Sequence, residues 1–249
     1  MEHKVVSREE WLEARKAHLT KEKELTRRRD ELNGQLRELP WVKVEKTYLF
    51  NGPDGEETLG DLFDGRSQLI IQHFMFGPGW KEGCVGCSLS ADHMEGALPH
   101  LEHHDVSFVV VARAPMKEIA PFQKRMGWRF KWVSSYDSDF NYDYHVSFTK
   151  EEIATGKVYY NFEVGDFQSE EMAGRSVFYK DEAGAIFHTY SSYARGGDHL
   201  LGVYNYLDLT PKGRDESRGM TDWVRHHDKY GAGDGGEWTG RYVIEAARV

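Results

Sequence analysis

The stretch GWKEGCVGCSLSADHM (residues 79–94) contains both cysteines of the 249-residue chain, Cys84 and Cys87, two residues apart. It follows the apolar run SQLIIQHFMFG (67–77), which is typical of a buried β-strand. Residues 87–104 mix small, polar and apolar side chains as a helix does. The cysteines are therefore expected where a strand gives way to a helix. A bond between the sulfurs, a shared metal and coincidence are the three explanations of this C-x-x-C spacing.

Further elements of the same kind follow along the chain. VSFVVVARA (106–114) and RFKWVSSY (129–136) read as strands, and PMKEIAPFQKRMGW (115–128) between them reads as a helix. Pro99 should kink or break the helix at 87–104. Alternating strands and helices are typical of a parallel sheet covered by helices, and ligands bind at the carboxyl ends of such strands. The sequence thus predicts an α/β fold with its site near the cysteines.

The N-terminal region has a different pattern. Ser7 followed by Glu10 fits a capping box, and the absence of proline before Pro40 predicts a long helical extension over residues 1–39. A thin apolar stripe recurs at heptad spacing, formed by Trp11, Leu25, Leu32 and Leu39. Such a helix would either lie on the domain or form the seam of a homodimer. WVKVEKTYLF (41–50) after it alternates like an edge strand.

The second half should complete one domain over residues 40–230. A polar, aromatic insertion is expected at about 137–165, and KVYYNFEV (157–164) reads as a strand. SVFYKDEAGAIFHTYSSY (176–193) reads as a hairpin that turns at Asp181 to Gly184, and DHLLGVYNYLDL (198–209) as a helix. Residues 231–249 form a Gly-rich C-terminal tail that ends in one short element.

The composition limits the classes of partner. A net charge of −9 argues against nucleic acid or an anionic membrane surface as the main partner. The first residues are charged and lack the apolar core of a secretory signal, and no apolar run approaches the ~20 residues of a spanning helix. A cytoplasmic protein is expected. In that reducing compartment, two close cysteines indicate redox chemistry or metal binding in preference to a structural disulfide.

The chemistry of two thiols at this spacing favours exchange. A cysteine at a helix N-terminus is stabilised as thiolate by unpaired N–H groups. Lowering its pKa from ~8.5 to ~7 takes roughly 2 kcal/mol, which a helix terminus can supply. Cys87, one turn further along, could then attack the same sulfur. No cofactor is needed for this exchange.

A metal site is the alternative use of the two thiols. A closed zinc site needs four ligands, and the cysteines supply two. The candidates for the others are the scattered His93, His100, His103 and His104, and the chain has no second C-x-x-C. No metal is therefore expected.

Several long motifs occur in an order that resembles a known bacterial family. They are FMFGPGWKEGCVGCSLSADH, VVVARAPMKEIAPFQKRMGWRFKWVSSYDSDFNYDYHVSF and SVFYKDEAGAIFHTYSSYARGGDHLLGVYNYLDLTPKGRDE. The chain is similar to the thioredoxin-like domain of unknown function 899, whose members are described as predicted dithiol-disulfide oxidoreductases. The resemblance implies a thioredoxin-like mixed sheet flanked by helices, with Cys84 as nucleophile and Cys87 as resolving thiol.

Two features depart from ordinary thioredoxins. Those proteins have Trp directly before the first cysteine, whereas this chain has Gly83 there and Trp80 four residues before Cys84. They also have a cis-proline before the strand that starts the final hairpin, where this chain has Arg175 and Ser176. Trp80, Arg175 and Ser176 are therefore expected to contact the substrate. An unidentified disulfide-bearing protein, or a small thiol or peroxide, is the expected partner.

Three functions remain open from the sequence. The first is a thiol-disulfide oxidoreductase built on the Cys84–Cys87 couple. The second is a non-catalytic binding protein with the same fold, in which the dithiol is vestigial or acts as a redox sensor. The third is a metal site built on the C-x-x-C pair.

Overall fold

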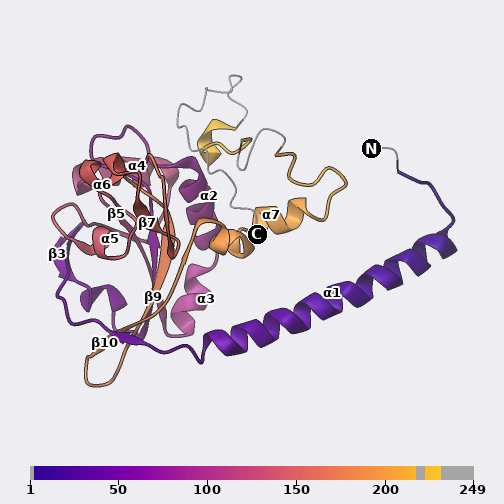
Figure 1. Cartoon of the computed structure of the whole chain (residues 1–249), viewed down its shortest axis with the longest axis horizontal. Helices are drawn as coiled ribbons and strands as arrows, with labels where there is room; N and C mark the ends of the chain where they lie inside the picture. The colour runs from indigo at the N-terminus through magenta and orange to yellow at the C-terminus, as the bar shows by residue number, and fades with distance from the viewer. Residues whose placement is uncertain (1–2, 217–221, 231–249) are drawn as a thin grey trace. The chain divides into compact units, whose positions relative to one another are not determined.

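The computed structural model describes residues 3–216 and 222–230, and the chain divides into two compact units after Trp41. The predicted tail at 231–249 lies outside the described residues. Figure 1 shows a long N-terminal helix and, in the second unit, a sheet with helices packed on it. None of the helices in the described ranges is both long and apolar enough to span a bilayer.

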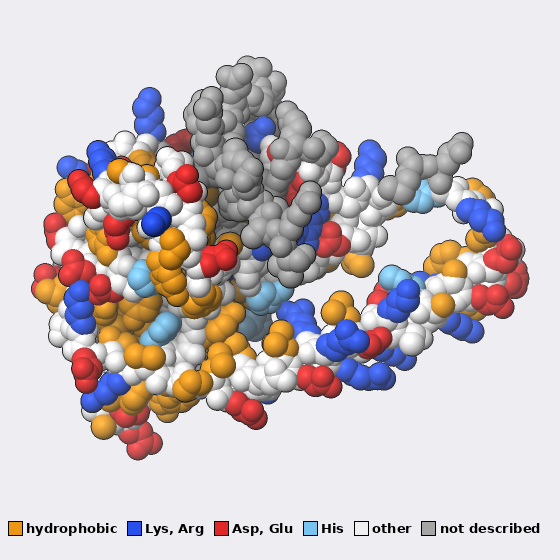
Figure 2. Space-filling view, viewed as in Figure 1, with side chains coloured by type: hydrophobic (Ala, Val, Ile, Leu, Met, Phe, Trp, Pro, Cys, Tyr) orange, Lys and Arg blue, Asp and Glu red, His pale blue; other side chains and the backbone are white. Residues whose placement is uncertain are grey.

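The first unit is built on α1 (Arg8–Leu36). Its capping box is present: Glu10 N–H donates to Ser7 Oγ (3.2 Å) and Ser7 N–H donates to Glu10 Oε2 (3.0 Å). No side chain of α1 is buried, and Leu25 and Leu32 are 69% and 64% exposed. The apolar residues emerge between charged ones along the helix (Figure 2). Homodimer formation through this stripe stays a prediction.

The second unit contains ten strands and six α-helices in the described residues. The strands are β1 (Val42–Lys43), β2 (Leu49–Gly52), β3 (Gly55–Thr58), β4 (Gln68–His73), β5 (Val106–Ala112), β6 (Lys131–Ser134), β7 (Val158–Tyr160), β8 (Glu163–Gly165), β9 (Gly174–Lys180) and β10 (Ile186–Tyr193). The helices are α2 (Val85–Met94), α3 (Leu98–His103), α4 (Met116–Met126), α5 (Phe140–Asp143), α6 (Lys150–Ala154) and α7 (Gly202–Leu207). Three 3₁₀ turns are added, η1 (Asp61–Phe63), η2 (Ala194–Leu200) and η3 (His227–Lys229).

Eight strands form one mixed sheet in the order β1-β10-β9-β4-β5-β6-β2-β3. The three central strands β4, β5 and β6 are parallel, and α2–α3 and α4 connect them. The hairpin of β9 and β10 pairs antiparallel with the other edge of β4. Two parallel strands joined through a helix, with a C-terminal antiparallel hairpin beside the first, make the fold thioredoxin-like. The predicted fold class is confirmed.

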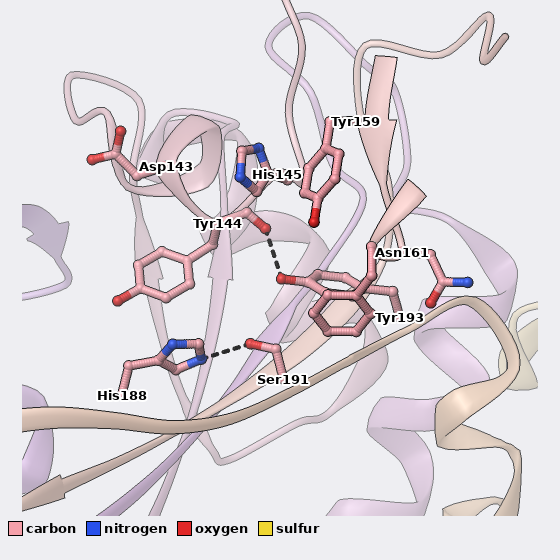
Figure 3. A pocket seen from close by; sticks show the side chains of 9 residues that line it. Asp143, Tyr144, His145, Tyr159, Asn161, His188, Ser191 and Tyr193 are labelled. Atoms are coloured by element: carbon pink, nitrogen blue, oxygen red, sulfur yellow. Dashed lines mark hydrogen bonds between the residues drawn. The ribbon is translucent and has the colours of Figure 1, made fainter. Parts of the chain in front are cut away.

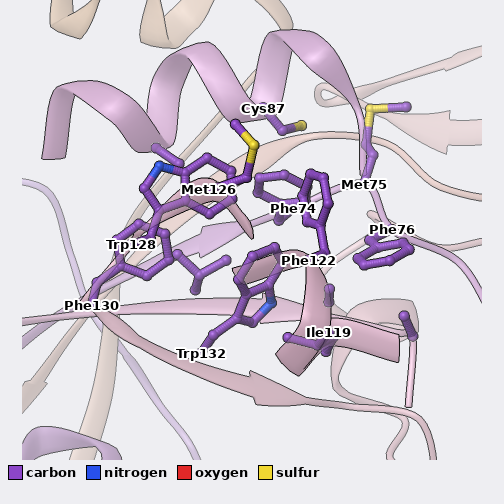
Figure 4. Close-up of a cluster of buried hydrophobic side chains, with 14 of the residues drawn as sticks. Phe74, Met75, Phe76, Cys87, Ile119, Phe122, Met126, Trp128, Phe130 and Trp132 are labelled. Carbon is purple, nitrogen blue, oxygen red and sulfur yellow. The ribbon is translucent and has the colours of Figure 1, made fainter. Parts of the chain in front are cut away.

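Alternate residues of the central strands enter two cores. Phe108 and Val110 of β5 face the helices α2 to α4, where Phe74, Phe122 and Trp132 gather with them. Val109 and Val111 face the opposite side. The ring centroids of Phe74 and Trp132 are 4.7 Å apart, and Figure 4 shows the aromatic cluster below α2. These aromatic side chains therefore serve mainly to pack the core.

The break predicted at Pro99 is present: the helix expected at 87–104 is divided into α2 and α3, and Pro99 lies in the first turn of α3. Three other local predictions differ from the structure. The edge strand expected at 41–50 is two short strands, β1 and β2, on opposite sides of the central strands, and the helix expected at 198–209 is divided between η2 and α7. KVYYNFEV (157–164) is not one strand: it forms the separate hairpin β7–β8, in which Tyr160 pairs with Glu163. Its two-residue turn is Asn161-Phe162 in place of the usual Asn-Gly, so the sequence lacks the signal by which such hairpins are identified.

Gly83 lies directly beneath the aromatic cluster, and we expect its replacement by alanine to destabilise the protein. A Cβ at this position would lie 2.9 Å from Cε1 of Phe122 and closer still to the ring of Phe74. Neither buried ring can swing away, so Gly83→Ala should lower the free energy of unfolding by about 1–3 kcal/mol. Denaturant unfolding measures this change.

Gly34 in α1 is the matched control, because nothing lies within 4 Å of a Cβ placed there. Gly34→Ala should leave stability unchanged or raise it by up to about 1 kcal/mol. Equal unfolding free energies for Gly83→Ala and the unmodified protein would show that ring packing does not restrict position 83.

Candidate functional site

The two cysteines lie at the carboxyl end of β4, in the loop that leads into α2. The loop is held by backbone contacts: Cys84 N–H donates to the Met75 carbonyl at 3.0 Å, and Trp80 N–H to the Gly77 carbonyl at 3.2 Å. Cys84 is the N-cap residue, and its carbonyl accepts the first helical bond, from Ser88 N–H at 2.9 Å. The strand-to-helix placement predicted from the sequence is observed.

A later part of the chain closes the loop from behind. The buried side chain of His226 bonds through Nε2 to the Gly83 carbonyl, 2.9 Å away, and its ring packs on Phe122 at 5.4 Å. Lys229 donates to both carboxylate oxygens of Glu82 at 2.8 Å. The residues just before Cys84 are thus fixed by a segment about 140 positions further along the sequence.

The structure brings Cys84 and Cys87 together as two free thiols in the first turn of α2. Cys84 is partly exposed, whereas Cys87 is 5% exposed and faces the aromatic cluster (Figure 4). The Cys87 thiol donates a hydrogen bond to the Cys84 sulfur. One sulfur is therefore accessible, and the other touches it from inside the protein.

The hydrogen bond between the sulfurs separates the two pKa values. It lowers the pKa of Cys84 to about 7, against burial, which acts in the opposite direction. The Cys84 sulfur makes no regular capping hydrogen bond, but the nearby N–H groups of Gly86 and Cys87 lower its pKa further. The same bond raises the pKa of Cys87, and burial adds to that rise. Cys84 is the group poised to ionise.

Arg175 of β9 lies on the same side of the sheet as the dithiol. It pairs across the strands with Gln72, and its Nη2 donates to Ser90 on α2. Ser90 Oγ donates to Gln72 Oε1 (3.1 Å), and Gln72 Nε2 donates to the Cys87 carbonyl (3.2 Å). Arg175 Nε is buried and has no hydrogen-bond partner among residues 3–216 and 222–230. A guanidinium thus occupies the position where the sequence comparison with thioredoxins expects a proline.

The charge of Arg175 acts on the inner thiol. Burial lowers the pKa of Arg175, and the Cys87 sulfur opposes that change because it attracts the cation. In turn, Arg175 and a hydrogen bond from the Met75 N–H partly offset the rise in the pKa of Cys87. The positive charge of Arg175 therefore makes the Cys87 thiolate more stable than it would be without a charged neighbour.

The two other predicted contact residues are placed differently. Trp80 is half-buried in the loop before Cys84 and packs on the same aromatic cluster as the cysteines. Ser176 is fully buried on the opposite face of the sheet, where its Oγ is 2.8 Å from His73 Nε2 and 2.8 Å from Ser191 Oγ. The structure therefore places Arg175 near the dithiol, Trp80 on the aromatic cluster that both cysteines also contact, and Ser176 on the other face of the sheet.

The structure adds a buried ion pair that sequence reasoning missed. Arg113 Nε donates to Glu171 Oε1 at 2.6 Å, and Ser147 Oγ donates to the other carboxylate oxygen at 2.7 Å. A Cβ at Gly77 would lie 3.3 Å from Glu171 Cγ and 2.9 Å from Trp80 Nε1, so the pair borders the dithiol loop. Burial raises the pKa of Glu171. An arginine at the carboxyl end of the buried strand at 106–112 was the available signal.

One of the histidines considered for a metal, His93, is engaged in hydrogen bonds. His93 Nδ1 is 2.6 Å from the Leu89 carbonyl, and its Nε2 accepts from Val203 N–H at 2.9 Å. Within residues 3–216 and 222–230, no group of three or more His, Cys, Asp or Glu side chains could hold a metal ion.

Comparisons with solved structures find similar proteins at low identity. A mutant of PrxQ from Xylella fastidiosa is 15% identical, with a TM-score of 0.42 over 68% of this chain and 94% of that one. The peroxidoxin BcpB from Mycobacterium tuberculosis is 13% identical, with a TM-score of 0.44 over 68% and 97%. A putative thiol:disulfide interchange protein DsbE from Chlorobium tepidum is 12% identical, with a TM-score of 0.41 over 67% and 94%.

No curated protein matches the chain. The profile of one family, described as "Bacterial protein of unknown function (DUF899)", matches residues 1–230. Nearly the whole described chain is covered by that match, and the chain belongs to this family.

Proposed function

We propose that the protein is a thiol-disulfide oxidoreductase in which Cys84 is the nucleophile and Cys87 the resolving thiol. The observation that carries the proposal is the placement of the pair: a partly exposed free thiol, Cys84, caps the N-terminus of α2, and a buried free thiol, Cys87, lies in the first turn of the same helix. The lowering of the pKa of Cys84 to about 7 by the Cys87 thiol agrees with this placement. Such a pair can attack, hold and release a substrate without a cofactor.

The reaction is two successive exchanges. The Cys84 thiolate attacks one sulfur of a substrate disulfide, the substrate S–S bond breaks, and the departing thiolate takes up a proton. Cys87 then loses its proton and attacks the Cys84 sulfur of the mixed disulfide, which releases the second substrate thiol and leaves a Cys84–Cys87 disulfide. The substrate gains two electrons and two protons, and a dithiol reductant must return the pair to its reduced form.

The lowered pKa of Cys84 raises the rate of its attack only modestly, and its larger effect is to determine which thiol attacks first. At pH 7 about half of Cys84 would be thiolate, against about 1% at the ordinary pKa of 9.0. A nucleophile of lower pKa is intrinsically weaker, and a Brønsted slope near 0.5 removes about tenfold of that roughly 50-fold gain. The remaining rate gain is only a factor of about five. The main effect is therefore the order of the two steps, in which Cys84 attacks the substrate first and Cys87 reacts second.

Trp80 and Arg175 are the proposed substrate contacts. Trp80 supplies a partly exposed apolar surface in the loop before the accessible sulfur. Arg175 supplies a positive charge with one unpartnered N–H group on the same face of the sheet. This combination favours a disulfide that has an anionic group near its sulfurs, on an unidentified protein or on a small molecule.

Cys84→Ser should abolish the exchange. We expect reduction of a model disulfide, coupled to dithiothreitol or glutathione, to fall to the uncatalysed rate. Cys87→Ser should retain the first attack and accumulate a mixed disulfide at Cys84, visible by intact-protein mass spectrometry. Equal turnover by Cys84→Ser and the unmodified protein would exclude Cys84 as the nucleophile and favour the non-catalytic binding function.

The reactivity of Cys84 should depend on pH and on the donor at position 87. The rate of alkylation by iodoacetamide should rise with pH through a midpoint of about 7, because only the thiolate reacts. Cys87→Ala removes the donor and should raise the midpoint by about one to two pH units. Cys87→Ser keeps a hydroxyl donor and serves as the matched control. The same midpoint in both variants would show that the hydrogen bond does not set the pKa.

Arg175→Met should slow the reaction of the protein with anionic disulfides. The second-order rate constant with 5,5′-dithiobis(2-nitrobenzoate), which carries two carboxylates, should fall about tenfold. The constant with neutral 4,4′-dithiodipyridine should change much less, and the ratio of the two corrects for any altered thiol pKa. Arg129→Met, at a side chain 77% exposed, is the control. An unchanged ratio in Arg175→Met would remove Arg175 from substrate binding.

A further inference from the structure

A cavity of about 260 Å³ is lined by residues that lie outside the dithiol loop and α2. Figure 3 shows the side chains around it, which come from the end of α5 and the residues after it, the hairpin β7–β8, and β10. The lining residues are Asp143, Tyr144, His145, Tyr159, Asn161, Phe162, His188, Ser191 and Tyr193. None of them takes part in the proposed exchange reaction.

The walls of this cavity are aromatic and largely uncharged. Tyr144, Tyr159, Phe162 and Tyr193 supply four rings. The Phe162 and Tyr193 centroids are 5.4 Å apart, and Tyr193 Oη donates to the Tyr144 carbonyl at 3.1 Å. Burial raises the pKa of Tyr144 and of Tyr193, so both phenols stay neutral. Flat apolar surfaces of this kind favour a planar ring.

The backbone on one side of the cavity is strained. Asn161 and Phe162 form the two-residue turn of β7–β8 with φ of 53° and 66°, in the left-handed region. Asparagine tolerates this conformation, but a phenylalanine there costs on the order of 1–3 kcal/mol. Phe162 is 65% exposed, so core packing does not repay that cost. Glycine would suit the turn better, which indicates that the Phe162 ring serves the cavity.

One hydrogen-bond acceptor faces these rings. His188 Nε2 is 3.0 Å from the Tyr190 carbonyl, which can only accept, so Nε2 carries the hydrogen. Burial lowers the pKa of His188, and the ring is neutral. Its Nδ1 is therefore an unprotonated acceptor, and it has no hydrogen-bond partner within the part of the chain that the structure describes.

A buried chain of polar groups is compatible with this tautomer. His188 Nε2 is 2.8 Å from Ser191 Oγ, Ser191 is 2.8 Å from Ser176 Oγ, and Ser176 is 2.8 Å from His73 Nε2. With the Nε2–H of His188 shared between the Tyr190 carbonyl and Ser191 Oγ, each hydroxyl can donate to the next group, and His73 Nε2 accepts at the end. Burial lowers the pKa of His73 to about 3, so this ring also stays neutral.

The charges near the cavity are already compensated. The carboxylate of Asp143 accepts from Lys46 Nζ at 2.6 Å and from Tyr48 Oη at 2.8 Å. Lys46 also contacts Asp139 at 2.9 Å. The lining residues thus offer no unpaired Asp, Glu, Lys or Arg to a charged ligand.

We propose that this cavity binds a small, uncharged, planar aromatic molecule that bears a hydroxyl or ring N–H group. The ring would lie among the tyrosines and Phe162, and its O–H or N–H would donate to His188 Nδ1. A volume of about 260 Å³ suits one or two fused rings. The site is independent of the dithiol, and so is its test.

The test is calorimetric titration of the whole protein with phenol and with toluene, which has the same shape but no donor. Phenol should bind with one-to-one stoichiometry and about tenfold more tightly than toluene. His188→Phe keeps a ring and removes the acceptor, so it should abolish that preference. Phe162→Gly relieves the turn and should raise stability while it weakens phenol binding about fivefold or more.

Tyr136→Ala, at a tyrosine 50% exposed outside the cavity, should leave phenol binding unchanged. No saturable phenol binding, or equal affinity for phenol and toluene in the unmodified protein, would overturn the proposal. So would unchanged phenol binding in both His188→Phe and Phe162→Gly, provided that their circular dichroism spectra show them folded.

Discussion

The register between β4 and β9 is the constraint on which both sites depend. Gln72 pairs with Arg175, and Ile71 pairs with Ser176. Because side chains alternate across a sheet, Arg175 faces α2 and the dithiol, whereas Ser176 shares the opposite face with His73. A slip of one residue would exchange the two side chains, bury a guanidinium in the wrong core and leave the dithiol without its cation.

The same sheet therefore carries two different chemical environments. On one face, the two sulfurs share a hydrogen bond that favours charge on the outer one and keeps the proton on the inner one. On the other face, two neutral histidines and two serines form a chain that ends at an aromatic cavity. The first environment favours a charged group, the Cys84 thiolate, whereas the second keeps its histidines neutral.

Local signals in the sequence predict much of the fold. Ser7 and Glu10 mark the start of α1, and the apolar runs locate β4 and β5. The position of Cys84 at the N-terminus of α2 follows from the adjacent strand. These features depend on neighbours in the chain, and a single sequence contains that information.

Contacts between distant residues were beyond the same reasoning. The pairing of Arg113 with Glu171 joins positions 58 residues apart, and no periodicity announces it. The fate of Ser176 depends on strand register, which adjacent residues do not specify. Gln72 and His73 interrupt the apolar run of β4, which indicates a buried polar group on each face of the strand. Their partners lie on α2 and β9, however, and the residues next to them in sequence do not identify those partners.

The contact between His226 and the Gly83 carbonyl has a consequence for biosynthesis. A nascent chain emerges from the ribosome N-terminal end first, so the sheet and α2 can assemble well before residue 226 is available. Until then, the peptide group next to Cys84 lacks one of its hydrogen-bond partners, so the loop before the dithiol reaches its final geometry only after most of the chain has been made.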